Sequence, residues 1–502
     1  MPYKPARPGR TATTIKFLRI TRTVRSWQRS VSEGSVFRRF ADYAGAVRHY
    51  RRLTSVGTPR EELLELQQRR LVATVRHAAA ASSLYRELYA GIELAEDLDV
   101  RALPVVTKAM LMERFDEWVC DPRLRLPEVE SHLERIRGDE LYLGEYRCLP
   151  TGGTTGRRGV FVYDREEWRR CLSSFIRWSE LMGARSRLGR RLRVAGVGTT
   201  NPLHVTARVG LSLDLGLTAM QRLDARTPLG ELVAALDEHR PEFLLAYPSM
   251  ASLLAIEQLE GRLHIAPRIV CTNAEVRTEE MTANIRAAWG VEPFNFYGST
   301  EGLFACDCEH HQGMHVFEDL GLMEIVDEHG DPVPDGVAGA KLLITSFIKR
   351  TQPLIRYEVS DMVALTTAPC ACRRPLVRMV SVQGRSDDIL HMTGADGRTV
   401  AVHPLTLRSP MAALGELRQY KIVHDDDGLH VLVTLRDAAV VDEVSRRIEE
   451  TLRSKLLEAG VTDPRLDVSI VAELPREQGH SGKFKLIESR TSRGAAPPAQ
   501  AH

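Results

Sequence analysis

The stretch 151-TGGTTGRRGVFVYD-164 begins the pattern from which the fold is predicted. Its glycines allow backbone conformations that other residues resist, so their N–H groups can approach a ligand closely. Its threonines add hydroxyl donors, and a loop of this kind suits a phosphate, although a flexible surface turn stays open as the alternative. No lysine follows the last glycine, which excludes a P-loop. The residues of this loop are Thr151, Gly152, Gly153, Thr154, Thr155 and Gly156.

The bulk composition describes an ordinary globular protein. At 502 residues the chain is long enough for one large domain and a small one, and 43% hydrophobic with 27% charged residues is typical of globular chains. A net charge of +2 indicates no particular partner. No apolar run reaches the length of a membrane span, and the N-terminus lacks the apolar core of a secretory signal. We therefore expect a cytoplasmic protein.

The N-terminus is nevertheless unevenly charged. Every charged residue before Glu33 is a lysine or an arginine. Such an arm could bind nucleic acid or another anionic surface. Aromatic residues are few there and no nucleic-acid motif follows, so a solvated extension that packs loosely on the main body is favoured.

Hydrophobic periodicity predicts an α/β fold. A short strand over 160–163 precedes a helix-spaced apolar set at Trp168, Cys171 and Phe175, and further short apolar runs alternate with helical stretches. Hairpin-like segments follow, and from residue 385 onward two strands, a helix and another strand form a compact α+β unit. The expected domains are a basic extension (1–59), a large body with mixed sheets and helices (60–384), a small mobile C-terminal lid (385–490) and a disordered tail (491–502).

One further segment, 294-FNFYGSTEG-302, contains groups that suit nucleotide chemistry. Tyr297 offers an aromatic face for a purine ring. Thr300 could bond a phosphate oxygen, and Glu301 could hold Mg²⁺, a hard cation that takes carboxylate and phosphate oxygens. A strand end followed by a capped helix is the alternative.

Isolated polar residues later in the chain are ambiguous by themselves. Asp361 is expected to end an apolar strand and could bind ribose hydroxyls or simply cap a turn. Arg385 and Asp387 fall at the expected domain junction, near 384–388. Lys483 lies in the segment 480-HSGKFKL-486, where a lone lysine is ordinarily solvated.

The order of these motifs is more specific than any one of them. TGGTTG, YGSTE, RYEVSD, GRSDD and SGK occur in the order of the core motifs of the adenylate-forming superfamily, which the chain resembles over roughly residues 60–488. Within it the chain is most similar to the phenylacetate-CoA ligase branch, which includes coenzyme F390 synthetase-like proteins. Supporting stretches are VRHAAAASSLYRELY (75–89), LPVVTKAML (103–111) and TNAE (272–275).

The resemblance implies roles for these residues. The 151–156 loop would hold the β- and γ-phosphates of ATP, Tyr297 and the 273–275 turn would flank adenine, and Asp361 with Arg385 would hold the ribose. Thr300 and Glu301 would serve the α-phosphate and Mg²⁺. The implied nucleotide-binding residues are Thr151, Gly152, Gly153, Thr154, Thr155, Gly156, Asn273, Ala274, Glu275, Tyr297, Gly298, Asp361 and Arg385.

Lys483 would reach the site from the small domain and bridge the substrate carboxylate and the α-phosphate, with Asp387 as the hinge. A lysine and Mg²⁺ suit a step in which two anions must be held in line. A rotating C-terminal domain would then present the acyl-adenylate to a thiol or another nucleophile.

The sequence departs from the family pattern in places. Arg157-Arg158-Gly159 replaces the usual Pro-Lys after the loop, Asn273 replaces a glycine, and the segment 196–210 aligns only loosely with the acyl-pocket region. These differences leave the acid and the acceptor open. The candidate acyl-pocket residues, each of which could equally be structural, are His204, Tyr247 and Ser249.

The cysteines fall into two groups. Four are scattered and are expected to be reduced core residues, whereas Cys308 and His315 with the later pair Cys370 and Cys372 have the composition of a structural zinc site. Some members of the branch have a similar arrangement. Cys306 or His310 could replace a ligand, reduced thiols in a loop are the alternative, and a disulfide is not expected in the cytoplasm.

The leading hypothesis is a two-step ligase that uses ATP and Mg²⁺ to convert a carboxylic acid, expected to be aromatic, to an acyl-adenylate and pyrophosphate, and then acylates CoA. Alternatives are transfer to an amine or a carrier protein, AMP transfer like that of F390 synthetase, and a non-catalytic nucleotide-binding protein. Glu301, Asp361 and Lys483 together argue against the last. Acyl specificity and oligomeric state stay open.

Overall fold

The computed structural model describes residues 33–54, 57–151, 158–184, 191–216, 218–394, 397–412, 414–436, 441–475 and 484–491. The arm before residue 33, Gly152 to Gly156 of the Gly/Thr loop, and Lys483 lie outside these residues. Across the described part, no helix has both the length and the apolar composition of a membrane span.

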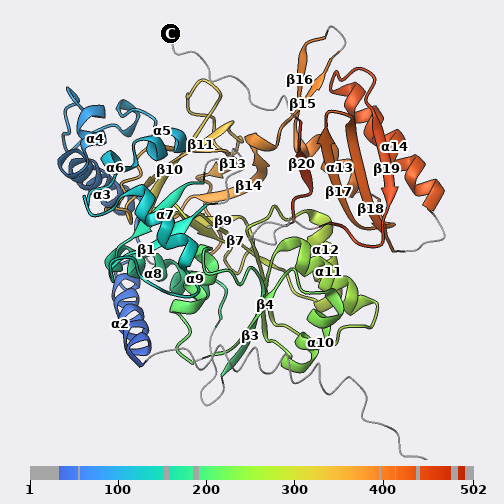
Figure 1. The fold of residues 1–502 in the computed structure, drawn as a ribbon, viewed down its shortest axis with the longest axis horizontal. Coiled ribbons are helices and arrows are strands. Elements are labelled where there is room, and N and C mark those ends of the chain that lie inside the picture. The colour runs from blue at the N-terminus through green and yellow to red at the C-terminus, as the bar shows by residue number, and fades with distance from the viewer. Residues whose placement is uncertain are drawn as a thin grey trace, which may run out of the picture.

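A nine-stranded mixed sheet forms the centre of the large N-terminal body (Figure 1). Its strand order is β13-β14-β9-β8-β7-β6-β5-β3-β4. The half from β7 to β4 is parallel, and the half from β7 to β13 is antiparallel. The strands are β3 (Leu192–Gly198), β4 (Thr218–Asp224), β5 (Phe243–Ala246), β6 (Ile269–Asn273), β7 (Phe294–Gly298), β8 (Phe304–Cys306), β9 (Met314–Val316), β13 (Asp361–Thr366) and β14 (Arg378–Arg385).

Helices cover both faces of the parallel half. Successive side chains of a strand point to opposite faces, and here the side chains on both faces are apolar, so each face needs a covering layer. Val194, Phe243 and Cys271 belong to the apolar cluster that includes α8 (Arg165–Leu181). The alternate residues Ala195 and Leu244 belong to the cluster formed with α10 (Leu229–His239), α11 (Pro248–Leu259) and α12 (Glu279–Trp289). These layers confirm the predicted α/β class.

Smaller elements complete the large body. An antiparallel sheet β10-β11-β12 and a hairpin β1-β2 pack with the N-terminal helices. Their bounds are β1 (Arg147–Pro150), β2 (Val160–Tyr163), β10 (Gly321–Val326), β11 (Lys341–Ser346) and β12 (Tyr357–Val359). The remaining helices are α3 (Arg60–Ala81), α4 (Ser83–Leu88), η1 (Val100–Ala102), α5 (Lys108–Glu113), α6 (Phe115–Trp118), α7 (Leu126–Arg135) and α9 (Val205–Ser212).

The C-terminal part of the expected N-terminal extension differs from the prediction. Residues Glu33–Tyr50 form the helix α2, which packs against α8 (Figure 1). Asp42 is fully buried and pairs with Arg147, Arg165 and Arg169. A loosely packed extension would not bury a paired carboxylate, so this helix is part of the body.

The C-terminal residues form a separate apolar cluster, drawn in orange and red in Figure 1. Its sheet has the order β19-β18-β17-β20, in which β17 and β18 are the predicted hairpin. It is reached through the short helix η2 (Ser386–Asp388). The elements are β15 (Leu390–Thr393), β16 (Thr399–Val402), α13 (Pro404–Ala412), β17 (Leu417–Asp425), β18 (Gly428–Leu435), α14 (Val441–Glu458), β19 (Leu466–Ile470) and β20 (Ile487–Ser489).

Candidate active site

A cavity of about 1060 Å³ lies where the carboxyl ends of the parallel strands meet the C-terminal segment. Ligands bind at this edge in open α/β sheets, because the loops after adjacent strands converge there. The predicted residues that line the cavity are Thr151, His204, Tyr247, Ala274, Glu275, Tyr297, Gly298, Thr300, Glu301, Asp361 and Arg385. One space therefore holds residues that are spread over more than two hundred positions of the chain.

Asp361 joins two of the predicted nucleotide-binding residues. The Tyr297 hydroxyl donates to Asp361 Oδ2 at 2.6 Å, and Arg385 Nε donates to Oδ1 at 3.1 Å. Asp361 and Arg385 are directly opposite each other in the β13–β14 hairpin. Asp361 begins β13; it does not end the preceding strand. Burial, together with the adjacent carboxylate, raises the pKa of the Tyr297 phenol, so the hydroxyl remains a donor that fixes the ring.

Glu301 lies in the turn after β7. The Tyr163 hydroxyl donates to the Thr300 carbonyl at 2.6 Å and holds this turn against β2. Gly302 has a φ of +93°, and a Cβ there would lie 3.2 Å from the Tyr163 hydroxyl. Burial raises the pKa of the Glu301 carboxyl, a cost that a bound divalent cation would offset. A buried carboxylate in a cavity is the kind of ligand that Mg²⁺ takes.

In the chain, the Gly/Thr loop lies between the strands β1 and β2. At its base the Thr151 N–H donates to the Gly159 carbonyl at 2.8 Å, and the Gly159 N–H donates to Thr151 Oγ1 at 3.1 Å. A Cβ on Gly159 would lie only 2.7 Å from Thr151 Oγ1, so the closure requires glycine. The side chain of Lys108, which sequence reasoning left without a role, also lines the cavity beside this base.

The 273–275 turn is built differently from the expectation. Asn273 is buried at the end of β6 and does not line the cavity. Ala274 takes the left-handed conformation, with a φ of +68°, and lies on the cavity wall. Glu275 accepts hydrogen bonds from the Ser249 N–H at 3.1 Å and from the Phe484 N–H at 2.6 Å.

The three acyl-pocket candidates have different positions. His204 caps the start of α9 and lines the cavity. Tyr247 also lines it, and its hydroxyl accepts the Thr199 N–H at 3.1 Å. Ser249 is buried in the first turn of α11 and does not line the cavity. The structure thus brings two of the three to the site.

The cavity also contains polar residues to which sequence reasoning gave no role. Arg277, which follows β6, donates to the Thr272 hydroxyl and the Pro293 carbonyl. Asn295 of β7 also lines the cavity. Lys485 Nζ pairs with Asp388 Oδ1 at 2.6 Å, beside the predicted hinge. Asp387 lies in η2, between β14 and the C-terminal strands. A polar residue within a strand or next to a motif gives no signal of its own in one sequence.

The predicted metal ligands form a compact group. The ligand atoms of Cys308, His315, Cys370 and Cys372 all lie within 4.8 Å of one another, and all four residues are buried. Cys308 Sγ is 3.7 Å from Cys370 Sγ, and Cys372 Sγ is 3.2 Å from His315 Nε2. Sulfurs about 2.3 Å from a tetrahedral Zn²⁺ lie about 3.8 Å apart, whereas a disulfide needs about 2.05 Å. The donor set and its spacing fit zinc.

The other cysteines fit the prediction in most respects. All eight are free, and Cys148, Cys171 and Cys271 are buried as expected, while Cys120 is half-buried. Cys306 is buried but stands outside the metal-ligand group, as does the exposed His310.

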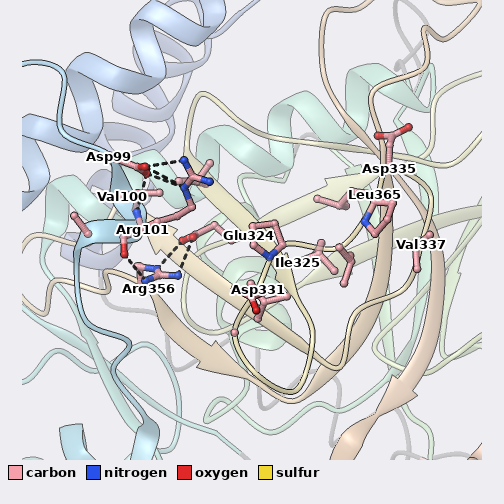
Figure 2. A pocket seen from close by; sticks show the side chains of 17 residues that line it. Asp99, Val100, Arg101, Glu324, Ile325, Asp331, Asp335, Val337, Arg356 and Leu365 are labelled. Atoms are coloured by element: carbon pink, nitrogen blue, oxygen red, sulfur yellow. Dashed lines mark hydrogen bonds and ion pairs between the residues drawn. The ribbon is translucent and has the colours of Figure 1, made fainter.

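A second cavity of about 820 Å³ lies beside the β10–β11–β12 sheet (Figure 2). Figure 2 shows Asp99 paired with Arg101 and Glu324 paired with Arg356, whereas Asp331 and Asp335 lie apart from these pairs. None of the predicted site residues lines it. The predicted nucleotide-binding residues that the structure describes therefore gather at the larger cavity, with the exception of Asn273.

Comparison with known proteins shows which proteins the chain resembles. No protein-family model matches the chain. It is similar to the phenylacetate-coenzyme A ligase of Thermus thermophilus (27% identity, 88% of this chain and 94% of the relative) and to that of Escherichia coli (26%, 84% and 93%).

Among solved structures it is similar to 2-hydroxyisobutyryl-CoA ligase in the postadenylation state with R3-HIB-AMP (19% identity, 85% of this chain and 89% of that one, TM-score 0.64). The structure of that enzyme in the thioesterification state gives a TM-score of 0.54 at 20% identity, over 87% of this chain and 91% of the other. The chain is thus a homologue of the phenylacetate-coenzyme A ligases with the fold of the adenylate-forming CoA ligases, as the order of its motifs predicts.

Proposed function

We propose that this protein is an AMP-forming acid–thiol ligase. The observation that supports it best is the convergence in one cavity of Thr151, Tyr297, Glu301 and Asp361 with the segment that directly follows Lys483. The relatives named as phenylacetate-coenzyme A ligases support an aromatic acid as the substrate and CoA as the acceptor.

In the first step, a carboxylate oxygen of the acid attacks the α-phosphorus of ATP, and pyrophosphate leaves. Asp361 and Arg385 would orient the ribose, and Tyr297, whose hydroxyl is anchored on Asp361, would present its ring to adenine. Glu301 would hold Mg²⁺, which supplies positive charge beside the phosphates when bound. Lys483 would bridge the two reacting anions, a task that suits a compact ammonium.

In the second step, the sulfur of CoA attacks the acyl carbonyl, its proton passes to solvent, and AMP leaves. His204 and Tyr247 would line the acyl pocket, since both face the cavity after β3 and β5. A zinc ion held by these residues would be structural, because none of the four lines the cavity and together they would supply all four ligands of a tetrahedral site.

Carboxylate-dependent exchange of pyrophosphate into ATP tests the first step. We expect exchange with aryl acids in a panel that also contains fatty and amino acids, and its loss in Lys483→Ala. Lys455→Ala, an exposed lysine on α14, is the matched control and should retain activity. The mass of the final product then distinguishes acyl-CoA from an amide, an acylated carrier or an AMP adduct. Absence of exchange together with absence of ATP binding would refute the proposal.

A further inference from the structure

The carboxylate of Glu275 connects three separate parts of the chain. Its Oε2 accepts the N–H of Ser249, in the first turn of α11. Its Oε1 accepts the N–H of Phe484, which belongs to the C-terminal segment, at 2.6 Å. Glu275 itself follows β6. Both oxygens are therefore used to hold backbone, which differs from the adenine-flanking role that the motif implies.

The Phe484 N–H belongs to the peptide bond that joins Lys483 to Phe484. Phe484 is buried, and from Leu486 onward the segment is fixed in the C-terminal sheet, where the Ile422 N–H donates to the Leu486 carbonyl and β20 pairs with β17. Glu275 thus holds the end of this segment that lies nearest the proposed catalytic lysine.

Other contacts dock the C-terminal sheet on the helices α11 and α12. Arg418 of β17 pairs with Glu257 and Glu260 of α11, and Arg436 donates to Asn284 Oδ1 of α12 at 3.1 Å. These ion pairs and hydrogen bonds do not involve cavity-lining residues. The contact between Glu275 and Phe484 lies at the cavity wall, because both residues line the cavity.

We propose that Glu275 is a positioning residue that locks the C-terminal domain for the adenylation step. This inference rests on the proposed function. Catalysis of attack on the α-phosphate needs Lys483 held in place, and a charge-assisted hydrogen bond to the adjacent amide supplies such a restraint. For the thiol step the domain turns, so the same bond must break, and a single main-chain contact can be replaced by water.

The test compares both half-reactions in Glu275→Ala. Loss of one charge-assisted hydrogen bond predicts a fall of about 10- to 100-fold in the kcat of pyrophosphate exchange, with the KM for ATP changed less than about 3-fold. Thioester formation from supplied acyl-adenylate and CoA should change less than about 3-fold. Glu275→Gln keeps one acceptor oxygen, so we expect an intermediate loss. Glu279→Ala, whose side chain is 82% exposed at the start of α12, should leave every readout unchanged.

Hydrogen exchange at the Phe484 amide provides a readout that is independent of activity. We expect exchange at least about 10-fold faster in Glu275→Ala than in wild type. Two results would overturn the inference. Equal losses in both half-reactions would leave Glu275 as a structural residue. A raised KM for ATP, with kcat and the exchange rate of the Phe484 amide unchanged, would leave it as an adenine-contacting residue. If the wild type exchanges pyrophosphate with no acid, the proposed function fails, whereas the amide measurement still decides whether Glu275 holds the C-terminal domain.

Discussion

The metal-ligand group provides the sharpest prediction, which concerns Cys308→Ser. The Cys308 and Cys370 sulfurs are 3.7 Å apart, close to the roughly 3.8 Å separation that tetrahedral Zn²⁺ imposes on two thiolates. A serine hydroxyl at this position is a far weaker zinc ligand than a thiolate. We therefore expect purified wild-type protein to contain about one zinc per chain and the variant to contain close to none.

Loss of the metal should also lower stability, because ligand that binds only the folded chain adds to the free energy of unfolding. Zinc at about 100 times its dissociation constant contributes about 2.7 kcal/mol. At about 2–4 °C of melting temperature per kcal/mol in a large domain, the variant should melt about 5–10 °C lower. Chelation of the wild-type protein should produce a shift of similar size.

Elemental analysis and thermal unfolding measure both effects. Cys306→Ser is the matched control, because Cys306 is a buried thiol two residues away that stands outside the ligand group. The control should retain its zinc even if the buried hydroxyl lowers its melting temperature. Full zinc content in Cys308→Ser, or equal zinc loss in the control, would refute the assignment.

Two further predictions concern the nucleotide site and the domain interface. Asp361→Asn removes the charge that Arg385 and Tyr297 both contact, so the KM for ATP in pyrophosphate exchange should rise about 10- to 100-fold, and an unchanged KM would contradict the ribose role. Burial raises the pKa of Glu280 from 4.5 to about 7, so the folded protein binds this proton more tightly than the unfolded chain and stability falls as pH rises from about 4.5 through 7. Removal of this titration in Glu280→Gln should stabilise the protein at pH 8 by about 1–2 kcal/mol after allowance for partial exposure, with little effect at pH 4; denaturant unfolding at both pH values checks the difference.

Sequence reasoning predicted residues that meet in one cavity where a motif coincides with a strand end. Tyr297 and Glu301 follow the apolar run of β7, and strand ends in an α/β sheet converge regardless of their separation in sequence. The clustering of Cys308, His315, Cys370 and Cys372 was also predictable, since closely spaced cysteines and a histidine have few uses together other than metal binding.

Contacts between distant segments could not be predicted in this way. The Glu275–Phe484 hydrogen bond spans 209 positions, and no periodicity in either segment refers to the other. Ser249 follows the strand β5, as Tyr247 does, yet the turn into α11 buries it away from the cavity. Helix α2 was missed because the basic residues before Glu33 led to residues 1–59 being treated as one solvated extension, whereas Asp42 pairs with arginines far along the chain.

The β13–β14 hairpin connects features that the sequence presents separately. Near its tip, Cys370 and Cys372 lie beside His315 of β9 and beside Cys308, which follows β8. His315 is also paired in register with Arg378 of β14. At its base, Asp361 and Arg385 pair at the cavity, and the chain continues directly into η2. A metal that fixes the tip would therefore restrain the Asp361–Arg385 pair and the start of the domain connection together. This arrangement gives a structural zinc ion a physical reason to affect nucleotide affinity without contacting the nucleotide.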